Sequence, residues 1–209
     1  MKILRRPSSA GRGFAPWLTL ALLALALPLS ACGGAPPPAE HFYRLTTPVV
    51  TASAKPLPGI LVVERLRADG VTGERPMAHS RADQPQSLDT YRYHFWTEAP
   101  GRMLQQHLAK SLNDAKSASQ VMTDEAKVEG AWLLKGRLMH FEQVLGSQPK
   151  VVIEADMTLM KAKDYSLVHR ALYREEEPAQ GESPAAAVDA MQKAFARLCL
   201  RIAADMKAP

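Results

Sequence analysis

The stretch that most constrains the fold is residues 15–28, APWLTLALLALALP, which is apolar and uncharged. It follows a basic segment, residues 1–14, that has no acidic side chain. A run of this length matches the hydrophobic region of a secretory signal peptide and is short for a transmembrane helix of about 20 residues. We therefore predict that residues 1–31 are a targeting segment and do not belong to the folded domain.

The predicted signal peptide ends in a motif that resembles a lipid-attachment site. Leu29-Ser30-Ala31-Cys32 resembles the bacterial lipobox at all four positions. Small residues at 30 and 31 let the backbone enter a peptidase groove, and the Cys32 thiol is the nucleophile that takes a diacylglyceryl group. We expect signal cleavage between Ala31 and Cys32, with covalent lipid on Cys32 and no other cofactor. The alternative is an ordinary signal peptide in which Cys32 is incidental.

The lipid would hold the protein on a membrane without a transmembrane helix, because two or more acyl chains give stable anchoring. Gly33, and not an aspartate, follows the cysteine, which by resemblance to enterobacterial sorting indicates the periplasmic face of the outer membrane. Residues 33–40, GGAPPPAE, are typical of an extended spacer. The predicted organisation is a lipoprotein signal peptide (1–31), a lipidated cysteine with a flexible spacer (32–40) and a single periplasmic domain (41–209).

Most of the net positive charge of the chain lies in its N-terminal segment. The formal net charge is +5, from 26 Lys and Arg against 21 Asp and Glu, but four of the basic residues lie within residues 1–31. The rest of the chain is close to neutral, which argues against a nucleic-acid partner. Of the two cysteines only Cys199 lies in the folded part, which excludes a disulfide framework.

Several segments have the β-branched or alternating pattern of strands. They are residues 41–45, 60–66, 71–82 (an edge or a break at Pro76), 88–96, a short strand at 120–123, 131–145, 151–160 and 167–175. In 151–160 the odd positions are apolar and the even positions hold Glu154, Asp156 and Thr158, as in a half-buried antiparallel strand.

Two segments have the three-and-four spacing of amphipathic helices. Residues 101–115 carry a leucine stripe, and Thr97 is the expected N-cap. Residues 185–206 carry a second apolar stripe, with Ser183 as N-cap and Pro184 in the first turn. The predicted fold is α+β, a mostly antiparallel sheet packed by two amphipathic helices.

Motifs for catalysis are not found in the sequence. It has no G-x-S-x-G elbow and no phosphate-binding glycine loop. The six histidines show no pair at metal-ligand spacing. Glu154 and Asp156 lie on an apparent solvent face, and Cys199 lies in the apolar helix stripe, where it is expected to act as a small hydrophobe. We therefore predict no catalytic residue and no metal site.

Three aromatic residues and one glycine nevertheless stand out as candidates for a contact or a special structural role. Trp96 and Trp132 are large apolar groups in a chain with few aromatics, so they are either core residues or contacts to a partner or lipid. Tyr43 lies in the first predicted strand, whose terminal position suits addition to a partner's sheet. Gly136 interrupts the strand 131–145, which indicates a bulge or a close approach of another backbone segment.

The order of these features resembles the ABC-type transport auxiliary lipoproteins of the PqiC-like kind. The shared features, over residues 30–206, are the lipobox cysteine, FYRL, ILVVERL, GERPMAHSR, YRYHFWTEAPGRMLQQHLAKSL, LLKGRLMHFEQV, a hairpin and a C-terminal amphipathic helix. The family more often has a leucine after the proline of the TEAP segment, where this chain has Gly101.

The resemblance implies a non-enzymatic lipoprotein of the outer membrane that accompanies MCE-domain proteins and an ABC transporter. Such systems move phospholipids or similar hydrophobic compounds, and the lipoprotein would dock the MCE assembly, with a homo-oligomer as one arrangement. One alternative is an accessory role in another envelope assembly, either lipopolysaccharide assembly or support of a secretion channel. Another is a lipid-anchored periplasmic hydrolase, for which the sequence offers no nucleophile and base.

Overall fold

A computed structural model describes residues 37–51 and 55–206 of the chain. The expected signal peptide, the cleavage site at Ala31 and the lipidated Cys32 lie outside the described residues. From Ala39 onward the described residues belong to one compact unit. None of the helices within this described part combines the length and hydropathy that a membrane crossing requires.

Nine strands form one sheet in the described part of the chain. They are β1 (His41–Tyr43), β2 (Leu57–Val63), β3 (Arg67–Ala68), β4 (Pro76–Arg81), β5 (Gln84–Trp96), β6 (Ala118–Thr123), β7 (Trp132–Leu145), β8 (Lys150–Lys161) and β9 (Leu167–Pro178). The helices are α2 (Pro100–Asp114) and α3 (Pro184–Asp205), with short 3-10 turns η2 (Gly70–Gly73) and η3 (Asp124–Ala126).

Strand β7 is the centre of the sheet. One of its edges pairs with β8 in antiparallel fashion from Trp132 to Val144, and β8 pairs in the same way with β9. Its other edge pairs in parallel with β2, then β3, then β4. β6 pairs in parallel with β2, β5 is antiparallel to β4, and β1 is parallel to β5.

The predicted α+β class is confirmed, and the sheet is mixed. The longest pairings are antiparallel, while the shorter ones along the second edge of β7 are parallel. Parallel neighbours require a crossover connection, and here the segment that contains α2 lies between β2 and its parallel neighbours β6 and β7 in the sequence.

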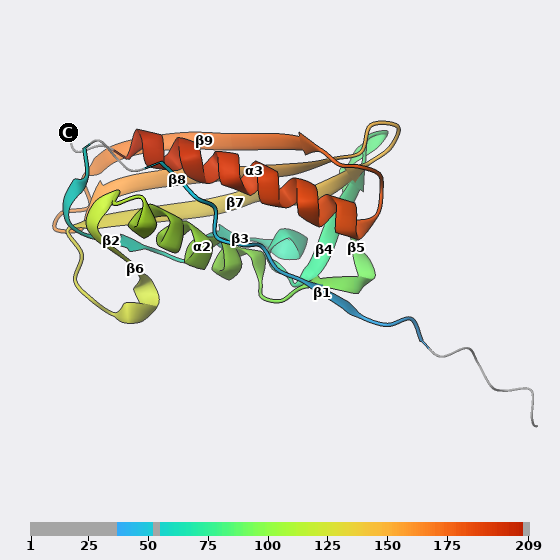
Figure 1. Cartoon of the computed structure of the whole chain (residues 1–209), viewed down its shortest axis with the longest axis horizontal. Coiled ribbons are helices and arrows are strands. Elements are labelled where there is room, and N and C mark those ends of the chain that lie inside the picture. The colour runs from blue at the N-terminus through green and yellow to red at the C-terminus, as the bar shows by residue number, and fades with distance from the viewer. Residues whose placement is uncertain (1–36, 52–54, 207–209) are drawn as a thin grey trace, which may run out of the picture. The chain divides into compact units, whose positions relative to one another are not determined.

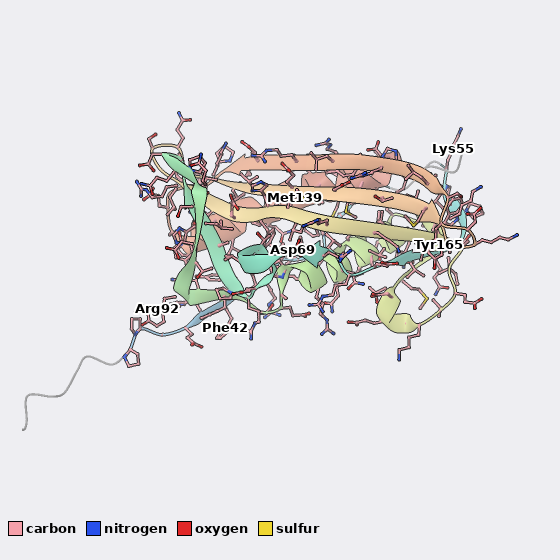
Figure 2. All side chains as sticks on the ribbon, turned by 180° about the vertical axis from the view of Figure 1, so that it is seen from behind. Phe42, Lys55, Asp69, Arg92, Met139 and Tyr165 are labelled. Carbon is pink, nitrogen blue, oxygen red and sulfur yellow. The ribbon has the colours of Figure 1, made fainter. Side chains whose placement is uncertain are left out.

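Both helices lie on one face of the sheet, as Figure 1 shows. α3 packs on β8 and β9, and α2 packs beside it near β6. The core between the layers contains the odd positions of β8 from Val151 to Leu159, which are buried as the alternation predicts. The opposite face of β7, β8 and β9 is not covered by a helix of the described domain, and it faces the viewer in Figure 2.

The predicted N-cap is confirmed for α3 and is wrong for α2. At α3 the prediction is confirmed: the Ser183 hydroxyl oxygen accepts a hydrogen bond from the Ala186 amide at 3.2 Å, and Pro184 opens the helix. At α2 the prediction of Thr97 as N-cap is wrong. The helix begins at Pro100, and Ala99 is the N-cap without a side-chain cap. The reason is that a residue before proline is kept out of the helical region, and Ala99 has a ψ of 135°.

Gly136 is a point of close approach, but the approaching groups are side chains and not the predicted backbone. A Cβ at this position would lie 2.5 Å from Met157 Sδ on β8 and 3.0 Å from Leu66 Cγ. The irregularity in the β7–β8 pairing lies further along, between Leu138 and His140. The missing side chain therefore makes room for Leu66 beneath the middle of β7.

Gly101 predicts an unusual effect of an alanine substitution. Alanine is better than glycine in a helix by about 1 kcal/mol, but at Gly101 the new Cβ would overlap the backbone carbonyl oxygen of Leu66. Because a backbone atom cannot give way cheaply, we expect Gly101→Ala to lower the free energy of unfolding by about 1–3 kcal/mol. Urea unfolding followed by circular dichroism measures this.

The matched control is Lys110→Ala, an exposed position in the same helix, which should change stability by no more than about 0.5 kcal/mol. A Gly101→Ala variant that is as stable as the wild type would contradict the close packing of α2 on the segment before β3.

Candidate functional site

Both tryptophans that the sequence singled out lie in the core. Trp96 is 1% exposed, and its ring centroid lies 5.1 Å from that of Phe141. Trp132 is 7% exposed, and its indole Nε1 donates a hydrogen bond to the Pro58 carbonyl oxygen at 2.7 Å. Of the two alternatives left open by the sequence, the structure has the core placement for both indoles, although the small exposed part of Trp132 lines a groove described below.

Tyr43 lies in β1, which pairs with β5 of its own domain. The register places His41, Phe42 and Tyr43 beside His94, Phe95 and Trp96. The Tyr43 hydroxyl lies 3.1 Å from His94 Nδ1. The amide that follows β5 donates a hydrogen bond to the Tyr43 carbonyl oxygen at 2.8 Å. Within the described part of the chain the other edge of β1 is unpaired.

The β1–β5 pair carries stacked rings. His41 stacks on His94 with centroids 5.0 Å apart, and Phe42 stacks on Phe95 at 5.6 Å. Partial burial and the neighbouring His41 lower the pKa of His94 below its usual value. His94 therefore favours its neutral form, in which two stacked imidazoles do not repel each other.

Phe42 is the residue that the sequence reasoning missed. It is 52% exposed, although it lies beside Tyr43, which is half-buried. The Arg75 guanidinium carbon lies 5.6 Å from the Phe42 ring centroid. Arg92 is exposed, and Figure 2 shows it at the same end of the domain as Phe42. The exposure of Phe42 could have been inferred from the alternation of side chains along a strand, which turns Phe42 and Tyr43 to opposite faces.

We call this part of the molecule the entry end, because the chain enters the folded domain here. It consists of Phe42, Tyr43, Arg75, Arg92 and Phe95. Its features are an exposed aromatic ring, a second ring stacked beneath it and two guanidinium groups.

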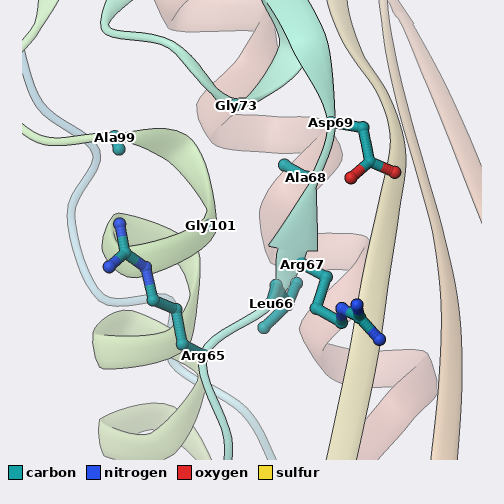
Figure 3. A pocket seen from close by; sticks show the side chains of 8 residues that line it. All are labelled: Arg65, Leu66, Arg67, Ala68, Asp69, Gly73, Ala99 and Gly101. Atoms are coloured by element: carbon teal, nitrogen blue, oxygen red, sulfur yellow. The ribbon is translucent and has the colours of Figure 1, made fainter.

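A hollow of about 380 Å³ lies between the segment around β3 and the start of α2. Its lining residues are Arg65, Leu66, Arg67, Ala68, Asp69, Gly73, Ala99 and Gly101. In Figure 3 the Arg65 side chain extends along α2, whereas Arg67 and Asp69 point to the other side. Asp69 is paired with Arg137. The polar groups therefore do not converge on a point where a ligand would be held.

A second groove, of about 720 Å³, lies at the opposite end of the domain from Phe42 (Figure 2). We call it the distal groove. It is lined by Val128, Glu129, Gly130, Ala131, Trp132, Leu133, Lys161, Ala162, Lys163 and Tyr165. Tyr165 is 65% exposed, and Lys135 Nζ lies 5.4 Å from its ring centroid. The groove combines apolar side chains with lysines at its rim, a composition that suits a protein segment with apolar and acidic residues.

The predicted solvent-face acids of β8 are paired with arginines of β9. Arg170 Nε donates to Asp156 Oδ1 at 3.0 Å, and Arg174 Nη1 donates to Glu154 Oε2 at 2.6 Å. The hydrogen bond from Arg170 lowers the pKa of Asp156 below its usual value. Each carboxylate has its own arginine partner, and the two are not arranged to share a proton, so they do not form an acid–base dyad.

Cys199 is fully buried in α3, and burial raises the pKa of its thiol. A protonated, inaccessible thiol acts as a small apolar side chain, as expected from the stripe. In the described ranges, no cluster of three or more His, Cys, Asp or Glu side chains is arranged to hold a metal ion.

Comparisons with known proteins identify the domain. Residues 43–203, from β1 into α3, match the family model of the ABC-type transport auxiliary lipoprotein component. The crystal structure of protein XCC0632 from Xanthomonas campestris superposes with a TM-score of 0.68 at 18% identity, covering 77% of this chain and 91% of that one.

A crystal structure of an uncharacterized protein superposes with a TM-score of 0.62 at 15% identity, covering 79% of this chain and 97% of that one. At these identities both comparisons concern the fold alone. Among curated proteins, none matches this chain. The family match covers most of the chain, and so the protein belongs to the ABC-type transport auxiliary lipoprotein family.

Proposed function

We propose that the protein is a non-enzymatic lipoprotein of the outer membrane that docks an MCE-domain assembly of an ABC-type system for transport of lipids or similar hydrophobic compounds between membranes. The observation that carries this proposal is the family match over residues 43–203. It covers the folded domain from β1 into α3. The family is an auxiliary component and not a class of enzymes.

The anchor in this proposal is lipid on Cys32, with the domain on the periplasmic face. The lipobox match at residues 29–32 and the proline-rich spacer support it. The spacer joins the domain at the entry end, so the distal groove lies at the end farther from the attachment point (Figure 2). We assign the contact with the MCE protein to the distal groove, because its exposed Tyr165 and its lysines face away from the tethered end.

The anchor predicts a clear difference between the two cysteines. Cys32→Ala should abolish incorporation of an alkyne analogue of palmitate in cells, because the acylated thiol is gone. Cys199→Ala should retain the label, because that thiol is buried in α3. Mass spectrometry of the purified proteins should place cleavage before residue 32 in the Cys199→Ala variant only. Label that persists in Cys32→Ala would contradict the anchor.

The docking role predicts a position-dependent crosslink. With a photoreactive phenylalanine at Tyr165, the tagged full-length protein should capture an MCE-domain protein from native membranes in mild detergent. The same group at Asp83, which is exposed in the β4–β5 turn, is the control and should capture it much less, because it lies away from the groove.

Capture of a lipopolysaccharide-assembly or secretion-channel component at Tyr165 would replace this proposal by the alternative role. Equal capture of the MCE protein at both positions would still support the MCE protein as the partner but would contradict the distal groove as its binding site. Light scattering of the same detergent extract distinguishes a monomer from a homo-oligomer.

A further inference from the structure

We infer that the entry end is a membrane-contact surface, which places the Phe42 ring in the headgroup layer of an anionic phospholipid bilayer. The inference deepens the proposed function and rests on it in one respect, the acylation of Cys32. It adds a second, non-covalent contact between the domain and the membrane, made by side chains of β1, of β5 and of Arg75 just before β4.

The length of the chain limits where the entry end can be. His41 is nine residues after Cys32, and a fully extended chain spans at most about 3.6 Å per residue. β1 is therefore held within about 32 Å of the lipid attachment point. Since β1 is the first element of the domain, no other part of the sheet is tied as closely to the bilayer.

The exposed ring is the apolar part of this surface. Phe141 and Phe195 are buried in the core, while Phe42 is 52% exposed at the entry end. Half-exposed aromatic rings gain by moving into the interface between water and acyl chains, where surface-bound elements bury Phe and Trp to a depth of about 5–10 Å. Tyr43 and Tyr93 lie on the same two strands and are half-buried. Tyrosine is enriched at membrane interfaces because its ring has one apolar and one polar end.

The arginines give the surface its preference for anionic lipid. Arg44 and Arg92 are exposed, and within the described ranges they make no ion pair or hydrogen bond. Arg75 lies over the Phe42 ring. By contrast, Arg170 and Arg174 on the uncovered sheet face are already paired with carboxylates. Free guanidinium groups attract lipid phosphates within a Debye length of the surface.

The pairing of β1 with β5 fixes the ring in place. Phe42 stacks on Phe95, and its neighbours in β1 are held by the parallel register and by the hydrogen bond to the Tyr43 carbonyl. Little conformational freedom remains to be lost when the ring enters the bilayer, and such preorganisation favours binding.

The test uses Phe42→Trp in the processed, acylated full-length protein, reconstituted into vesicles of phosphatidylethanolamine and phosphatidylglycerol with brominated acyl chains. Bromine quenches only nearby indoles. The matched control is Tyr165→Trp, an exposed position at the distal groove. Trp96 and Trp132 are buried and give the same background in both. We expect about twofold or greater quenching at position 42, since the ring would lie within about 10 Å of the acyl boundary, and little at position 165.

A second variant, Phe42→Trp with Arg92→Glu, should show less quenching in the anionic vesicles and no change in phosphatidylcholine vesicles. Circular dichroism verifies that each variant is folded. Equal quenching at positions 42 and 165, in protein whose mass shows acylated Cys32 and which floats with the vesicles, would overturn the membrane contact and leave the anchor intact. Protein that is not acylated would instead fail the proposed function. Shielding of position 42 only after addition of an MCE protein would overturn the inference in favour of a protein contact.

Discussion

The pairing of β7 with β8 is the interaction on which the rest of the structure depends. It runs from Trp132 opposite Lys161 to Val144 opposite Lys150, with one irregularity between Leu138 and His140. A slip by one residue would turn the odd positions of β8 away from the helices. The other edge of β7 holds β2, β3 and β4 end to end. The absence of a side chain at Gly136 lets Leu66 approach from the helix side, so the two halves of the sheet and the helix layer meet there.

The local patterns in the sequence were enough to predict most elements but not their neighbours. The alternation in β8 and the Ser183–Pro184 start of α3 depend on adjacent residues, and both are as expected. The parallel pairing of β2 with β6 and β7 depends on residues that are far apart in the chain. No periodicity within a strand encodes such a partner. Thr97 failed as an N-cap for a local reason, because Pro100 delays the helix.

Local sequence patterns were likewise not enough to place the candidate contact residues. A large aromatic side chain suits a core and an interface equally well, so composition could not separate Trp96 from Phe42. What separates them is the surroundings of each ring: Trp96 packs on Phe141 in the core, whereas Phe42 contacts Phe95 and the Arg75 guanidinium and remains half-exposed. That difference follows from the parallel addition of β1 to β5. The predicted cleavage and lipidation residues, Ala31 and Cys32, lie outside the described part and follow from the lipobox match.

The charged side chains are arranged differently on the uncovered sheet face and at the two ends of the domain. On the uncovered sheet face, Arg170 and Arg174 are each paired with a β8 carboxylate. Exposed pairs of this kind contribute only about 0–1 kcal/mol each. Because each arginine charge next to the exposed Met139 and Leu172 is matched by a carboxylate, this face has no unpaired guanidinium at these positions of the described part. Cations that lie over exposed rings occur instead at the entry end, where Arg75 lies over Phe42, and at the distal groove, where Lys135 lies over Tyr165. The uncovered face separates the two proposed contacts.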